Sequence, residues 1–246
     1  TESVTKVEKQ PIEMQNSSIR FTLSQLIQTK RLNEKEISQF SGGVDRLTQI
    51  VSEKSKGKHQ AHIQREIIHP IYYQSVNNPY LFIRELVQNA HDALVESQNE
   101  NKEMHIDLMS REEGSLTVRI EDPVGMSQET LINYFLVPGE TTKMDKKEQI
   151  GYFGQGLFTL FRGAKEVIMR TGTCDGVVTN MRITPKFEES GTLSDLDIAM
   201  EEENSDYKGT TIERVVETKH PQVEAAYVNN AACSFGVSFL TLASKD

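Results

Sequence analysis

Apolar residues recur every three or four positions over residues 79–97, which is the spacing of one face of an α-helix. Asn78 can cap such a helix, and Pro79 suits its first turn. The pattern therefore predicts a long helix over residues 79–97. Shorter helices are also expected, at residues 21–27, from residue 33, and at residues 44–51, 131–136, 157–161 and 221–232.

Apolar and polar residues alternate in several other segments, which indicates β-strands. Residues 104–108 and 116–120 form one such pair across a glycine turn. The acidic segment 188–206 is expected to be an irregular insertion, and the polar segment 139–149 a long mobile loop. Further strands are predicted at residues 167–170, 177–183, 210–216 and 237–242.

Helices and hairpin-like strands follow one another without the regular alternation of a doubly wound fold, which favours a two-layer α/β sandwich. Residues 1–17 carry scattered charge and little hydrophobic pattern, as disordered segments do. Residues 54–58 resemble a polar linker. We therefore expect an N-terminal extension over residues 1–58, partly disordered with short helices, and one main domain over residues 59–246.

Composition narrows the function classes. The chain has 246 residues and a net charge of -9, which argues against a non-specific nucleic-acid binder. Its two cysteines, Cys174 and Cys233, have no metal-ligand spacing and are expected to be buried thiols in a reducing compartment. No segment reaches the roughly 18 apolar residues of a membrane span, and no signal peptide is visible. These features predict a cytoplasmic protein.

Three polar residues share one face of the long predicted helix. Glu85, Asn89 and Asp92 are four and three residues apart, and apolar residues such as Leu86 and Ala90 flank them. A carboxyl–amide–carboxyl row on a partly buried face is suited to holding a metal ion and a water molecule. The alternative is an amphipathic helix whose polar stripe faces solvent.

Two glycine-containing turns add to this picture. Asp122 stands where a predicted strand runs into a turn with Gly125, so its carboxylate can accept a hydrogen bond from a base. Gly151, Gly154 and Gly156 precede a predicted helix, where free N–H groups bind phosphate well. Their spacing is neither the dinucleotide-binding fingerprint nor a P-loop, and a merely flexible turn is the alternative.

The order of these motifs resembles that of the GHKL ATPases (gyrase, heat-shock protein 90, histidine kinase and MutL), and most closely the N-terminal domain of heat-shock protein 90 chaperones. Residues 82–94 resemble the N-box of that family, and residues 122–126 its adenine-binding turn. Residues 151–158 resemble the glycine-rich segment that closes the ATP lid, and residues 208–212 the Gly-Thr strand of the pocket. The resemblance covers roughly residues 60–242. It implies a Bergerat-type fold, with a mixed, mostly antiparallel sheet and helices on one face.

The resemblance also implies a role for each residue of the long helix. Glu85 matches the general base that activates water, and Asn89 matches the magnesium ligand. Asp92 matches the third polar residue, which supports the nucleotide and its waters. The implied cofactors are ATP and Mg²⁺.

The remaining site residues take their roles from the same resemblance. Asp122 matches the acid that reads the adenine amino group, and Thr210 helps to fix adenine through water. Lys143, in a lid segment closer to that of the mismatch-repair relatives, either contacts phosphate or is a solvated loop lysine. The base-pocket and phosphate-facing positions are Gly125, Met126, Gly151, Gly154, Gly156 and Leu157.

Some positions depart from the family pattern. The adenine turn is one residue short, and matching without a gap places Glu121 where the acid belongs. We prefer Asp122 because Val118 and Ile120 alternate into it correctly. Tyr134 stands where the chaperones often carry an asparagine. Leu157, directly after the glycines, stands where the family has a phenylalanine.

The sequence thus predicts an ATP-binding, slowly hydrolysing domain of a larger chaperone-like protein, with a weak ATPase activity that needs a downstream domain or dimerisation. The alternative is a nucleotide-gated interaction module with little or no hydrolysis, for which residues 188–206 would provide a partner surface. Expected partners are ATP or ADP, a client protein, and a second copy bound through the N-terminal segment.

Overall fold

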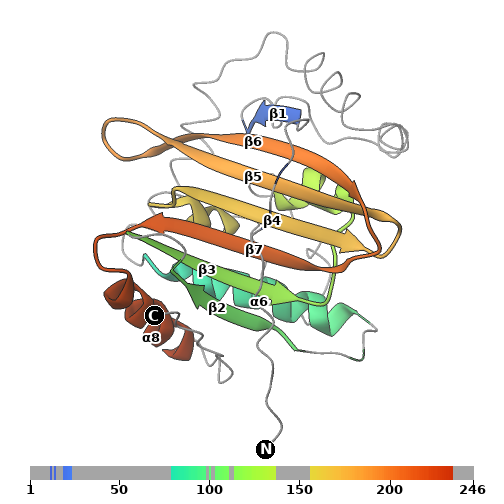
Figure 1. Cartoon of the computed structure of the whole chain (residues 1–246), viewed down its shortest axis with the longest axis horizontal. Coiled ribbons are helices and arrows are strands. Elements are labelled where there is room, and N and C mark those ends of the chain that lie inside the picture. The colour runs from blue at the N-terminus through green and yellow to red at the C-terminus, as the bar shows by residue number, and fades with distance from the viewer. Residues whose placement is uncertain are drawn as a thin grey trace, which may run out of the picture.

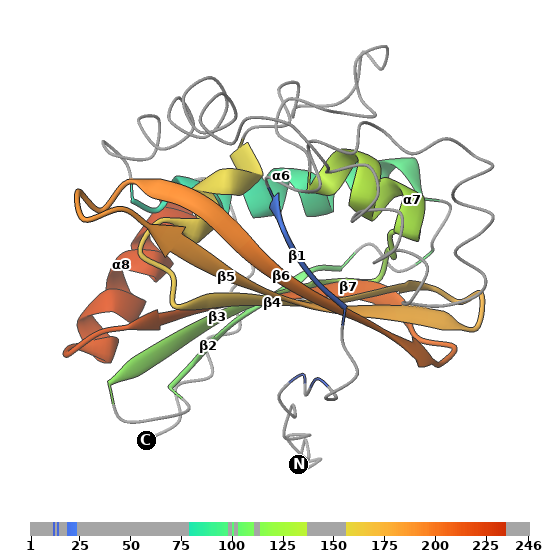
Figure 2. The same cartoon turned by 90° about the horizontal axis from the view of Figure 1, so that it is seen from above.

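The computed structural model describes residues 12, 14, 19–23, 79–97, 100, 103–110, 114–136 and 156–234. These residues form a seven-stranded sheet with helices on one of its faces (Figures 1 and 2). The α/β class with an antiparallel sheet is confirmed. The predicted helices at residues 33–51 and the final strand at 237–242 lie outside the described residues.

Every strand pairing in the described part of the chain is antiparallel, and the strand order is β1-β6-β5-β4-β7-β3-β2. The longest strands lie in the middle of this order, where each has a neighbour on both sides. The strands are β1 (Ile19–Thr22), β2 (His105–Met109), β3 (Ser115–Asp122), β4 (Glu166–Thr173), β5 (Val177–Phe187), β6 (Leu193–Asn204) and β7 (Lys208–Glu217).

The long helix α6 (Leu81–Glu96) lies over the sheet, as Figure 2 shows, and contacts β3. It begins two residues later than predicted, with Tyr80 at its N-cap. At its C-terminus the backbone N–H of Ser97 donates to the carbonyl oxygen of Ala93. Its apolar side faces the core: Phe82, Ile83 and Leu86 are all buried. The other helical segments are α7 (Gln128–Thr130), the π-helical turn η3 (Leu131–Phe135), the 3₁₀ helix η4 (Gly156–Phe161) and α8 (Pro221–Ser234).

Apolar and polar side chains alternate along the second half of β3, although both faces of this strand are largely buried. Leu116, Val118 and Ile120 of β3 belong to the buried core that the helices cover. The intervening residues of β3, such as Arg119 and Glu121, therefore point to the opposite face. This parity decides on which face each candidate site residue lies.

Two predictions of secondary structure differ from the structure. The acidic segment 188–206 is not an irregular insertion, because most of it forms β6, which pairs with β5 along its whole length. Its apolar residues Leu196, Ile198 and Met200 are buried, whereas acidic side chains fill alternate positions and hide the strand pattern. A helix was expected at residues 21–27, but its first two residues belong to β1, where Phe21 lies opposite Ile198 of β6, and residues 24–27 lie outside the described residues.

Arg214 ties three elements of the core together. Its guanidinium is buried on β7, stacks on the Phe82 ring of α6 at 4.3 Å, and donates to the carbonyl oxygens of Leu160 and Arg162 at 2.8 and 2.5 Å. Burial lowers its pKa to about 10, so it stays charged at neutral pH. The end of η4 is thereby fixed between α6 and β7.

Two further observations concern membrane-spanning helices and the exposure of the two cysteines. No helix in the part of the chain described here has the length and apolar character needed to cross a bilayer. Cys174 and Cys233 were expected to be buried, but both are exposed. Cys174 lies in the turn between β4 and β5 with φ 66°, a conformation found mainly in surface turns.

Candidate functional site

Helix α6 carries Glu85, Asn89 and Asp92 on one side, as their spacing predicts. The row becomes more buried along the helix: Glu85 and Asn89 are partly accessible, and Asp92 is buried. The ring Nδ1 of the exposed His91 lies 3.5 Å from a carboxylate oxygen of Asp92. This placement argues against a freely solvated stripe at Asp92, because a buried carboxylate needs partners.

Glu85 is held by its neighbour Arg84. The guanidinium Nε and Nη2 lie 3.2 and 2.6 Å from the same oxygen, Oε1. The Glu85 side chain is 16 % exposed and that of Arg84 is 44 % exposed. The pair therefore lies at the rim of the helix face, with one side turned to solvent.

The turn after β3 contains the second group of candidate residues. Asp122 is the last residue of β3 and accepts a hydrogen bond of 2.8 Å from the backbone N–H of Val124. Burial raises the pKa of Asp122 to about 7, and the bond from Val124 opposes this rise. The carboxyl is thus poised to change charge near neutral pH.

The alternation of β3 separates Asp122 from Glu121. Asp122 shares the covered face with Ile120, and its partner across the ladder is Thr210 of β7. Glu121 points to the other face, where its carboxylate lies 3.7 Å from Arg119. By strand parity Asp122 therefore lies on the face that α6 covers and Glu121 on the opposite face, and Asp122, at the strand end, also borders the pocket of that opposite face.

Two threonines hold this turn in place. The hydroxyl of Thr210 donates to the carbonyl oxygen of Val124 at 2.8 Å. The hydroxyl of Thr171, on β4, lies 3.0 Å from that of Thr210 and accepts a 2.8 Å hydrogen bond from the backbone N–H of Met126. Both threonines are buried. The turn is therefore fixed to β4 and β7 by bonds at Val124 and Met126.

Gly125 is required by a close approach of two backbones. A Cβ atom at this position would lie 1.7 Å from the carbonyl oxygen of Gly172 and 2.3 Å from its carbonyl carbon. No side chain fits such a gap. Met126 follows and packs against the core cluster. The glycine thus lets the turn lie flat on β4.

The remaining predicted site residues divide into two groups. Gly156 and Leu157 begin η4, which contacts α6. Lys143, Gly151 and Gly154 lie outside the described residues, so their roles stay predictions. The structure therefore brings the turn together with Thr210, and separately places η4 in contact with α6.

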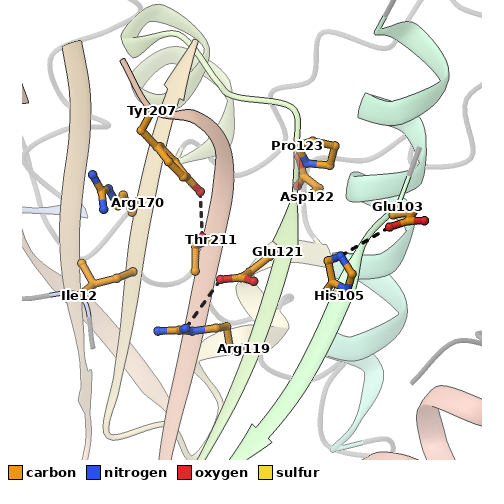
Figure 3. A pocket seen from close by; sticks show the side chains of 10 residues that line it. All are labelled: Ile12, Glu103, His105, Arg119, Glu121, Asp122, Pro123, Arg170, Tyr207 and Thr211. Atoms are coloured by element: carbon orange, nitrogen blue, oxygen red, sulfur yellow. Dashed lines mark hydrogen bonds and ion pairs between the residues drawn. The ribbon is translucent and has the colours of Figure 1, made fainter. Parts of the chain in front are cut away.

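A pocket of about 320 Å³ lies on the other face of the sheet (Figure 3). Its two guanidinium groups are already engaged: Arg119 pairs with the buried Glu213, and Arg170 bonds Glu203 at 2.9 Å. Its lining residues are Ile12, Glu103, His105, Arg119, Glu121, Asp122, Pro123, Arg170, Tyr207 and Thr211. Because the cations of this pocket bind carboxylates of the chain itself, it is a poor candidate for the phosphates of a nucleotide.

Sequence reasoning did not single out Thr171 or Arg84. Thr171 carries no motif signal because a threonine is ordinary in a strand, and only the ladder between β4 and β7 places it beside Thr210. Arg84 had a visible signal, since it precedes the proposed base directly. Adjacent helix residues rarely face each other, however, and this made the contact hard to anticipate.

Comparison with known proteins adds a partial relationship. A scan against models of protein families found no match. The chain is 27 % identical over 159 residues, 54 % of its length, to an endoplasmin homolog of Caenorhabditis elegans. It is 31 % identical over 129 residues, 43 % of its length, to the chaperone protein HtpG of Rhodococcus jostii (strain RHA1).

These similarities support a relationship to chaperones of the heat-shock protein 90 type and a chaperone-like domain. The chain spans about a fifth of the length of either relative. The activities and partners of those whole proteins are therefore matters for proposal.

Proposed function

We propose that this chain is the ATP-binding, slowly hydrolysing module of a larger chaperone-like protein. One observation carries the proposal: Asp122 and Thr210 are ladder partners on the sheet face that α6 covers, beside a turn that Gly125 presses against β4. Two acceptors at the end of a strand suit the amino group of a base. The polar row of α6 lies on the helix above the same sheet face.

The residues of α6 provide the chemistry for phosphate hydrolysis. Glu85 would accept the proton of the attacking water, for which Oε2 is the oxygen that Arg84 leaves free. Asn89 offers an amide oxygen of the kind that magnesium accepts alongside water and phosphate oxygens. The ion would neutralise phosphate charge. Asp92, buried one turn further on, would hold the waters around the nucleotide.

Slow turnover is expected for the isolated chain. Charge on the transferred phosphate usually requires a delivered arginine or lysine, which is worth orders of magnitude in rate. Lys143 lies in the lid segment before the glycine motif, as do Lys146 and Lys147. We therefore expect hydrolysis to rise when the native downstream part of the protein or a second copy is present.

Calorimetry with a non-hydrolysable ATP analogue and magnesium tests binding. We expect a saturable heat for wild type and its loss in Asp122→Ala, with both proteins folded by circular dichroism. A folded wild-type chain that binds no nucleotide contradicts the proposal. Asn89→Ala should bind the analogue more weakly than wild type in the presence of magnesium and as tightly as wild type in EDTA. This difference isolates the role of the amide.

A nucleotide-gated interaction module is the second candidate function. The shortened turn at Asp122 favours it. The argument from an irregular partner surface at residues 188–206 no longer holds, because residues 193–204 form β6. Glu85→Ala separates the two candidates. An ATPase loses turnover in this variant and keeps binding, whereas a gating module binds ATP in both forms and hydrolyses it in neither.

Dimerisation through the N-terminal segment belongs to the same proposal. The pairing of the edge strand β1 with β6 supports it, because β6 can accept the same segment from a second copy in place of its own β1. Deleting residues 1–58 and measuring thermal stability and oligomeric state is the test. Unchanged values for both would reject this role.

A further inference from the structure

The sheet has one face that the helices cover and one, called the open face from here on, where none of the described helices lies (Figure 2). Arg119, Glu213 and Ile168 are neighbours on the open face across the ladders of β3, β7 and β4. Their exposed fractions are nevertheless 3 %, 0 % and 4 %. A face of an antiparallel sheet that meets water leaves its side chains accessible. The low exposure of this row therefore indicates a cover other than those helices.

Ile12 identifies a part of the chain that lies on the open face. It lines the pocket there together with Arg119, Arg170 and Thr211 (Figure 3). Ile12 precedes β1 in the sequence and is partly buried, as is Met14. Residues two apart point to the same side of an extended chain, so one extended segment accounts for the burial of both apolar side chains.

We propose that the open face is a docking surface for an extended peptide segment, and that its occupant is the chain's own segment at Ile12 and Met14. Ile12 is the anchor, because it is the side chain of this segment that enters the pocket lining. Arginines offer apolar stems to such a residue while their head groups stay paired. The guanidinium groups of Arg119 and Arg170 are paired in this way, with carboxylates of the chain itself.

The charges of the open face explain why an apolar anchor fits it. The ion pair of Arg119 and Glu213 is already compensated and almost fully buried. Such a pair is strongly attractive only where water is excluded, and a cover of apolar side chains excludes it. A charged residue in place of Ile12 would bring a further charge to a compensated, desolvated pair, which is unfavourable.

The contact is suited to opening and closing. Two partly buried side chains hold a segment loosely, and segments with few buried contacts open locally without unfolding the rest of a domain. Strand β1 follows the segment and pairs with β6, which keeps the anchor close to its pocket at a high effective concentration. A second peptide with an apolar residue can therefore bind the open face when the chain's own segment leaves it. This inference does not depend on nucleotide binding.

The test measures how fast a thiol on the open face reacts with a thiol-specific reagent in the full chain. Cys174 and Cys233, which are both exposed, are first replaced by serine. Thr211→Cys then places one thiol in the pocket lining, and Ala164→Cys, in a separate chain, places one in the buried core. Adding Ile12→Asp should speed the reaction about tenfold at the pocket position, because the docked segment loses its anchor. The same change should leave the reaction of the core thiol as slow as before.

Two further variants serve as controls. Ile12→Leu keeps an apolar anchor of the same size and should leave the pocket thiol as slow as in the parent chain. Val223→Asp makes the same kind of change on α8, where the side chain is exposed, and should also have no effect. If Ile12→Asp fails to fold or speeds both thiols equally, Ile12→Ala replaces it and should speed the pocket thiol alone.

A synthetic peptide of residues 8–18 tests the docking surface directly. Added at millimolar concentration to the Ile12→Asp chain, it should slow the pocket thiol toward the rate of the parent chain. The same peptide carrying Ile12→Asp should not protect the thiol.

Three results would overturn the inference. The first is a pocket thiol that reacts equally fast with and without Ile12→Asp in folded chains. The second is Ile12→Ala speeding the pocket and core thiols equally, because that would show a general loss of stability. The third is a peptide of residues 8–18 that gives no protection. None of these results bears on the proposed nucleotide site, since no nucleotide is present in any arm.

Discussion

The guanidinium of Arg84 donates through two nitrogens to a single carboxylate oxygen of Glu85, at 3.2 and 2.6 Å. Residues next to each other on a helix point about 100° apart, so this contact bends both side chains toward the edge of the helix face. Oε1 is occupied, and the second oxygen, Oε2, is left for another partner. The pair therefore sets the rotamer of the proposed base.

Arg84→Met should lower ATP turnover about fivefold without changing ATP affinity, because the base loses its fixed orientation but not its identity. Turnover and calorimetric affinity of the full-length protein provide the measurement. Gln88→Met, on the same helix, is the control and should leave turnover unchanged. A loss as complete as that in Glu85→Ala would show instead that Arg84 acts on the phosphates.

Asp122 should make both stability and ligand affinity depend on pH. Its pKa is raised to about 7 in the folded chain, against about 3.9 in an unfolded one. The folded state therefore holds the proton more tightly, and the associated stability is present below about pH 4 and lost as pH rises through about 7. Urea unfolding at pH 5 and pH 8 should show a stability gap between Asp122→Asn and wild type that widens toward pH 8.

Nucleotide binding should follow the same group in the opposite sense. The ionised carboxylate accepts from an amino group, so ATP affinity of wild type should rise about tenfold from pH 6 to pH 8. Asp122→Asn has no proton to lose and should show a flat profile. A wild-type profile as flat as that of the variant would exclude Asp122 from the binding site.

Gly125→Ala should destabilise the chain by about 3 kcal/mol, because its Cβ would collide with the backbone of Gly172, which has no flexible end to move. Gly163→Ala is the control: its φ is 65°, but a Cβ there meets no atom within 4 Å. Backbone strain alone should cost about 1 kcal/mol at that position. Urea unfolding of both variants measures the loss of stability at each position. Equal losses of stability would contradict the close approach at Gly125.

Arg214→Met should destabilise the chain by about 3 kcal/mol. The change removes two hydrogen bonds from a buried cation and leaves the carbonyls of Leu160 and Arg162 without their donor. Arg182→Met is the matched change at an exposed ion pair, where the guanidinium Nε lies 3.4 Å from Glu166, and it should stay within about 0.5 kcal/mol of wild type. A small effect at Arg214 would show that η4 does not depend on this anchor.

Patterns of period 3.6 and 2 predicted the elements whose two faces differ most. Helix α6 and the pair β2 and β3 carry apolar residues on one side and polar residues on the other, and the structure confirms them. Strand β6 escaped prediction because acidic side chains occupy its open positions and Asp195 is itself buried. Charge content suggested an insertion where the alternation of Leu196, Ile198 and Met200 indicated a strand.

The candidate site divides in a similar way. Glu85, Asn89 and Asp92 follow from helical spacing alone, since their shared face needs no tertiary information. Thr171 could not be found in this way, because its partner Thr210 is far away in the sequence and only the register of β4 with β7 joins them. Local patterns predict the faces of elements, and the contacts between elements require the fold.

Among the paired strands of the described sheet, β1 and β6 are the furthest apart in sequence, with Ile19 opposite Met200. Closing so long a loop is entropically unfavourable, so this pair should form after the local hairpins of the sheet. During synthesis, residues 19–22 would leave the ribosome well before their partner strand exists. Until β1 pairs with it, β6 exposes a row of unpaired backbone N–H and C=O groups. A nascent chain at this stage is expected to bind molecular chaperones.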